Sequence, residues 1–65
     1  MNNIYEVFNR ANEVKTATEA FNILNTLTIE EIEMLFESND LEVEGLRKED
    51  KIEALIYYTM CKEYE

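Results

Sequence analysis

The chain has 65 residues and a mass of 7.7 kDa, which is enough for one small domain with a modest hydrophobic core. Its 15 Asp and Glu residues outnumber 6 Lys and Arg residues, and the net charge of −9 disfavours binding to nucleic acid or to anionic membranes. The chain has no His, one Gly and one Cys, which argues against a glycine-rich phosphate loop, a zinc site and histidine acid–base chemistry. We therefore expect a protein that is not an enzyme, with no catalytic residues, no metal and no cofactor.

Two helices are predicted in the first 26 residues. Asn2 or Asn3 lies where a helix N-cap is expected, ahead of apolar residues at helical spacing, namely Ile4, Val7, Phe8 and Ala11. Thr16 and Glu19 form a capping-box pattern that opens a second helix, with an inner face of Ala17, Ala20, Phe21 and Leu24. Residues 12–15 form a weak break without Gly or Pro, so two helices and one bent helix both fit the pattern.

A third helix is predicted after Thr28, because Thr28 and Glu31 form a second capping box. Its apolar stripe consists of Ile29, Ile32, Leu35 and Phe36. Met34 lies off this stripe, and the opposite side carries Glu30, Glu33 and Glu37. The polar residues Ser38, Asn39 and Asp40 are expected to end the helix, because such side chains compete for backbone hydrogen bonds and tolerate left-handed geometry.

The period of the apolar pattern changes from helical to two after the third helix. Leu41 and Val43 alternate with Glu42 and Glu44, which predicts a short extended segment that ends at Gly45. A last helix is expected from about residue 48, and its inner face comprises Ile52, Leu55, Ile56, Thr59 and Met60.

The sequence LTIEEIEMLF at residues 27–36, followed by LEVEG at residues 41–45, resembles the SAP and related HeH (helix–extended loop–helix) modules. These modules share a Leu-Thr-Val-Glu-Glu-Leu start, a helix, a hydrophobic extended loop, a glycine and a second helix. The sequence KEDKIEAL at residues 48–55 is similar to their second helix once one residue is inserted. The resemblance covers about residues 27–56.

The predicted fold is an all-α single domain over residues 1–65. Residues 27–65 form the helix–extended loop–helix unit that the resemblance implies, and residues 1–26 cover it with one or two helices. The predicted core comprises Phe8, Phe21, Leu24, Ile32, Leu35, Leu41, Val43, Ile52, Leu55 and Ile56.

The resemblance implies nucleic-acid binding through basic residues around the loop and the start of the second helix. The matching positions here are Arg47, Lys48 and Lys51. Residues 42–51 nevertheless carry four acidic residues against these three basic ones, and Asp40 stands where the family has Gly. The alternative interpretation is that these cations form salt bridges with neighbouring carboxylates.

An acidic surface is the second candidate site. Residues 21–45 contain seven acidic residues and no basic residue. Six of them are predicted to form one negative surface: Glu30, Glu33, Glu37, Asp40, Glu42 and Glu44. Such an array imitates the phosphate charge that basic proteins bind, although Glu is also simply a good exposed helix former.

We expect a small acidic interaction protein that binds a basic or nucleic-acid-binding protein through this surface. By analogy of size and charge, it is similar to accessory or inhibitory proteins of phages and mobile elements. The alternatives are a DNA- or RNA-binding module and a self-associating structural protein that forms a homodimer. A cytoplasmic location without membrane contact is expected, because the chain shows neither a signal-peptide pattern nor an apolar run of about 18 residues.

Overall fold

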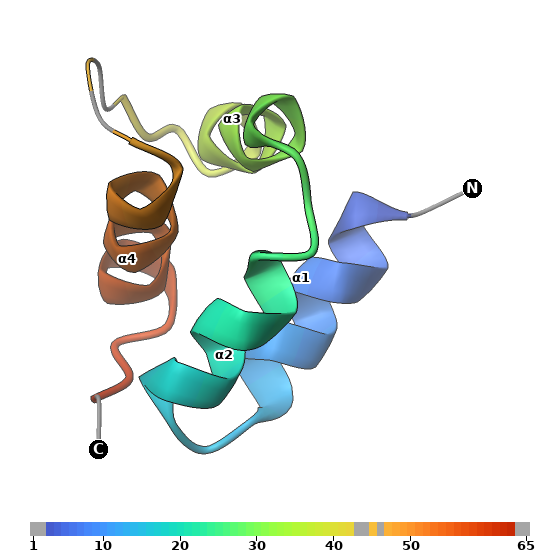
Figure 1. Cartoon of the computed structure of the whole chain (residues 1–65), viewed down its shortest axis with the longest axis vertical. Helices are drawn as coiled ribbons and strands as arrows, with labels where there is room; N and C mark the ends of the chain where they lie inside the picture. The colour runs from blue at the N-terminus through green and yellow to red at the C-terminus, as the bar shows by residue number, and fades with distance from the viewer. Residues whose placement is uncertain (1–2, 43–44, 46, 64–65) are drawn as a thin grey trace.

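The computed structural model describes residues 3–42, 45 and 47–63, and these fold into four helices without a β-strand. The helices are α1 (Ile4–Glu13), α2 (Ala17–Leu24), α3 (Ile29–Ser38) and α4 (Lys48–Thr59). Figure 1 shows α1 and α2 side by side, with α3 across one end of this pair and α4 along its flank. Contacts run around a ring, since α1 and α4 each pack against both α2 and α3. The all-α prediction is confirmed.

The core lies inside this ring and draws on every helix. Its largest fully buried side chains are Leu24, Leu27, Ile32, Leu35, Ile52, Leu55 and Ile56. Phe8 and Phe21, which we expected in the core, are half-buried and pack against its edge. Fully buried alanines lie where α1 and α2 meet the core, and their small side chains let the helices approach closely: Ala11, Ala17 and Ala20.

The predicted N-caps fix where the first three helices begin. The side chain of Asn3 accepts backbone N–H groups from the first turn of α1. Thr28 and Glu31 form the complete capping box: Thr28 Oγ1 accepts the Glu31 N–H at 3.2 Å, and Glu31 Oε1 accepts the Thr28 N–H at 2.9 Å. At α2, Thr16 Oγ1 accepts the Glu19 N–H at 3.2 Å.

Two separate helices, rather than one bent helix, make up the N-terminal part of the chain. Val14 and Thr16 have extended backbones, with ψ angles of 160° and 154°. The Lys62 ammonium donates to the Val14 carbonyl, and the Ala17 N–H donates to the Glu63 carbonyl at 3.0 Å. The C-terminal tail therefore lies against the start of α2, as Figure 1 shows.

The end of α3 is a Schellman motif. The Leu41 N–H donates to the Phe36 carbonyl at 2.8 Å, and the Asp40 N–H donates to the Glu37 carbonyl at 3.1 Å. Asp40 has a φ angle of 56°, in the left-handed region that this motif requires. The polar run at residues 38–40 ends α3 as expected, since the helix stops at Ser38.

The loop after α3 follows the predicted alternation as far as it is described. Leu41 is half-buried against the core and Glu42 is exposed. Val43 and Glu44 lie outside the described residues. Gly45 has a φ angle of 75°, which a residue without a Cβ adopts readily.

Candidate protein-binding site

The solvent-facing side of α3 is the basis of the candidate site. Glu30, Glu33, Met34 and Glu37 follow one another at intervals of i, i+3, i+4 and i+7, which places them on one helix face. The opposite face packs Ile32 into the core, so this face must turn outward. All three glutamates are exposed, and Met34 is 51% exposed.

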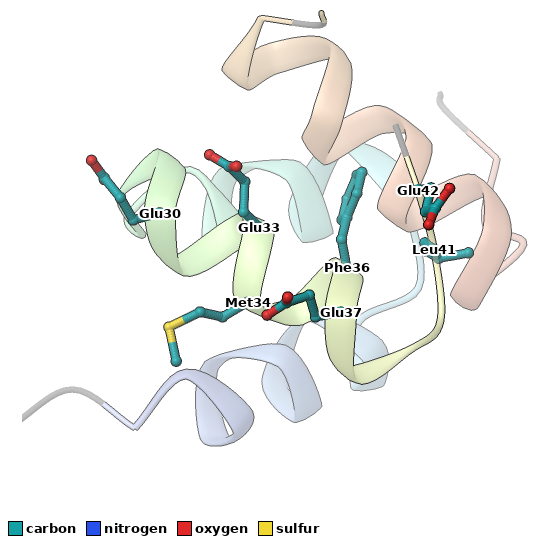
Figure 2. Close-up of a pocket in the computed structure, with 7 residues that line it drawn as sticks. All are labelled: Glu30, Glu33, Met34, Phe36, Glu37, Leu41 and Glu42. Carbon is teal, nitrogen blue, oxygen red and sulfur yellow. The ribbon is translucent and has the colours of Figure 1, made fainter. Parts of the chain in front are cut away.

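A groove of about 400 Å³ runs along this face, and we call it the α3 groove. Its lining combines four carboxylates with three apolar side chains: Glu30, Glu33, Glu37 and Glu42, together with Met34, Phe36 and Leu41. Figure 2 shows Phe36 between Glu30 and Glu33 of α3 and the loop residues Leu41 and Glu42. The Schellman turn holds Leu41 beside Phe36, because the Leu41 N–H donates to the Phe36 carbonyl at 2.8 Å.

A second groove adjoins the α3 groove at the end of the helix. It has a volume of about 410 Å³, shares Glu37, Leu41 and Glu42 with the first, and adds Asp40. The structure therefore brings together five of the six predicted acidic residues: Glu30, Glu33, Glu37, Asp40 and Glu42. Glu44 lies outside the described residues.

The apolar part of the lining was not predicted as part of a site. Met34 lies off the apolar stripe of α3, and its position four residues after Glu30 is the sequence signal that it shares the acidic face. For Leu41, the sequence pattern predicts a core position only. It is half-buried, so one side packs against the core and another lines the groove.

One buried cation modifies the charge of the α3 groove. Lys51 of α4 is 8% exposed, and its Nζ lies 3.5 Å from Oε1 of Glu33. In the described part of the chain, this is the one ion pair that a carboxylate of either groove makes. The other carboxylates keep their negative charge at the surface, so the groove stays strongly acidic.

The basic residues assigned to nucleic-acid binding have separate surroundings. Lys48 donates from Nζ to the Asn25 carbonyl at 3.0 Å, at the C-terminal end of α2 where a cation is favourable. Lys51 is paired with Glu33 rather than with the neighbouring Glu or Asp residues of α4. Arg47 is exposed and precedes α4 without a side-chain cap. Nucleic-acid binding stays a prediction, with two of its three side chains engaged in the fold.

Two exposed tyrosines line a further groove at the other end of α4. Tyr57 is 70% exposed and Tyr58 is 61% exposed, and their rings meet edge to face with centroids 5.1 Å apart. The groove has a volume of about 480 Å³, and its lining also includes Cys61, Lys62 and Glu63. Exposed tyrosines are common at protein interfaces, but this groove lacks the clustered carboxylates of the α3 groove.

Scans against protein-family models, curated proteins and solved structures find no match to this chain. Among the described residues, no group of three or more His, Cys, Asp or Glu side chains is placed to hold a metal ion. None of the described helices has the length and hydropathy to span a bilayer. The candidate site is accordingly defined by the geometry of α3 and the loop after it.

Proposed function

We propose that the protein binds a positively charged protein through the carboxylates of the α3 groove and the adjoining groove. The observation that carries this proposal is the gathering of five exposed carboxylates on one helix face and the turn that follows it. A cluster of one sign of charge raises the local concentration of oppositely charged partners and speeds their association.

The spacing of the carboxylates supports a partner that normally binds phosphates. Residues three and four apart on a helix have Cβ atoms about 5–6 Å apart, so Glu30, Glu33 and Glu37 form a regular row of charges. A row of this kind can occupy the nucleic-acid-binding surface of another protein. The proposed role is therefore that of an accessory or inhibitory protein.

The contacts of the basic residues favour this proposal over the nucleic-acid alternative. The resemblance to helix–extended loop–helix modules implies nucleic-acid binding through Arg47, Lys48 and Lys51. Lys51 is buried against Glu33, however, and Lys48 is bonded to the end of α2. The alternative predicts salt-sensitive binding to DNA that is lost when Arg47, Lys48 and Lys51 are all replaced by Ala.

The test compares two triple variants of equal charge. Glu30, Glu37 and Glu42 are changed to Lys in the first variant, and Glu33 is left in place because it pairs with Lys51. Exposed glutamates that line neither groove are changed to Lys in the control, namely Glu13, Glu19 and Glu53. Circular dichroism verifies that both variants stay helical.

Partners are captured from a lysate of the native host with and without nuclease treatment. Their affinities for the original protein and for both variants are then measured at several salt concentrations. We expect the groove variant to lose at least about tenfold in affinity at low salt, and the control to lose much less. An equal loss in both variants would assign binding to net charge and overturn the proposal. A partner that disappears with nuclease treatment would favour the nucleic-acid alternative.

A further inference from the structure

We propose that the α3 groove selects a basic polypeptide segment that carries an apolar side chain between its cations. This inference rests on the proposed function and adds a second recognition element to it. The occupant is a Lys- or Arg-rich segment of a partner protein with a Leu, Ile, Met or Phe among the basic residues.

The apolar lining of the α3 groove is the first support. Met34 is 51% exposed although it lies among glutamates on the outer face of α3. Leu41 is half-buried and lines the same groove, whereas Phe36 lines it as a core residue that is only 4% exposed. A side chain placed against Met34 or Leu41 would remove apolar surface from water, which charge pairing alone does not do. Methionine suits this role because its flexible thioether adapts to different partners.

The position of the carboxylates supplies the second support. Glu30 and Glu33 lie on one side of Phe36 in Figure 2, and Glu42 lies on the other side. Glu37 belongs to the same lining and also to the adjoining groove. A segment that places an apolar side chain on the apolar lining can therefore bring cations to carboxylates on both sides of it.

The sign of the charge identifies the occupant. Four carboxylates line the α3 groove, and the buried Lys51 pairs with one of them, Glu33. Phosphate groups would be repelled by the remaining carboxylates. A second copy of this chain carries a net charge of −9, so it would also be repelled. A cationic segment is complementary to this lining.

The experiment uses a pair of short synthetic peptides as probes. One has a leucine flanked on each side by arginines, and the other has serine in place of the leucine. Their affinities for the whole protein are compared with those for Met34→Gln, which keeps the side-chain length and helix propensity but removes the apolar end. Tyr57→Gln is the matched control, since it removes an exposed apolar side chain outside the groove.

We expect the leucine peptide to bind about fivefold more tightly than the serine peptide. Met34→Gln should remove this preference and Tyr57→Gln should keep it. Added salt should weaken both peptides while the ratio of their affinities persists, because the apolar contact is not screened.

Three results would overturn the inference. The first is equal binding of the two peptides, with both weakened by Glu37→Lys. This result would support charge-based binding, as in the proposed function, and would contradict selection of an apolar side chain. Absence of binding by either peptide at low salt would remove both proposals. Self-association in sedimentation that Met34→Gln abolishes would assign the groove to a second copy of the chain.

Discussion

Lys51 of α4 and Glu33 of α3 form an ion pair in which Nζ and Oε1 lie 3.5 Å apart. The Lys51 side chain is 10% exposed and the Glu33 side chain is 56% exposed, so a buried ammonium meets a carboxylate that also reaches water. An ammonium removed from water is costly unless a partner compensates it. The pair thus connects the packing of α4 on α3 to the charge of the α3 groove.

Replacing Glu33 should lower the stability of the protein, because the buried Lys51 ammonium would lose its ion-pair partner. We expect Glu33→Gln to lower the free energy of unfolding by about 1 kcal/mol, a modest value because the carboxylate is half-exposed. Lys51→Met removes both the buried charge and the cost of desolvating it. The free energy of unfolding of this variant should therefore stay within about 0.5 kcal/mol of that of the unchanged protein. Urea unfolding measures both. Glu37→Gln is the control on the same groove, and an equal effect of the two glutamine variants would contradict a specific role for the pair.

The capping box of α3 should matter more than the cap of α2. Thr28→Ala removes the acceptor of the Glu31 N–H, and we expect it to cost about 1–2 kcal/mol. Thr16→Ala should cost about 0.5–1 kcal/mol, because the first turn of α2 also donates from Ala17 to the C-terminal tail. Thermal unfolding, monitored by circular dichroism, compares the stabilities of Thr28→Ala and Thr16→Ala. Thr28→Ser is the control, because its hydroxyl should keep the cap. A larger loss at Thr16 would show that α2 depends on its cap more than α3 does.

Asp40 occupies a left-handed backbone conformation that glycine adopts without strain. We expect Asp40→Gly to raise the free energy of unfolding by about 0.5–1 kcal/mol, since it relieves the φ angle of 56° and removes a negative charge from the C-terminal end of α3. Asp40→Asn should give only the part of this gain in the free energy of unfolding that comes from removing the charge. Asp40→Ala should lower the free energy of unfolding. Urea unfolding of the three variants separates the two effects. A stabilisation by Asn equal to that by Gly would attribute the whole gain to charge.

The bounds of α3 could be predicted because the signals that set them are local. The Thr28–Glu31 capping box is complete within the first turn, and the Schellman turn at Asp40 is complete within the last. Helix ends of this kind depend on side chains and backbone groups that are close in sequence. The acidic face of α3 follows directly from helical spacing once these bounds are known.

The features that sequence could not supply depend on contacts between distant segments. The separation of α1 from α2 involves Lys62 and Glu63, at the far end of the chain. Lys51 lies four residues before the buried Leu55, so helical spacing does place it on the inner face, but its charge favoured an exposed interpretation. Its pairing with Glu33 becomes visible only when α4 packs on α3.

The C-terminal tail should stabilise the start of α2. Lys62→Ala removes the donor to the Val14 carbonyl, and we expect the free energy of unfolding to fall by about 1 kcal/mol. The Ala17 N–H, which donates to the neighbouring Glu63 carbonyl, should exchange with solvent about fivefold faster. Amide hydrogen exchange measures this directly. Lys15→Ala, an exposed lysine in the same turn, is the control, and equal effects of the two variants would argue against the tail contact.

Charge reversals at the two ends of α3 should affect stability in opposite directions and binding in the same direction. Glu37→Lys places a cation near the negative end of the helix dipole and four residues after Glu33, so we expect a gain of about 0.5–1 kcal/mol in the free energy of unfolding. Glu30→Lys places a cation in the first turn and should lower it by a similar amount.

Both reversals should weaken binding of an arginine-rich peptide, because both carboxylates line the α3 groove. Urea unfolding and peptide titration at low salt measure the two properties on the same samples. A stabilised Glu37→Lys protein that no longer binds would mean that Glu37 is kept for recognition at a cost in stability, as is common at functional sites. Unchanged binding in both variants would leave the row of glutamates without a role in recognition, and a gain in stability at Glu37 would then reflect helix electrostatics alone.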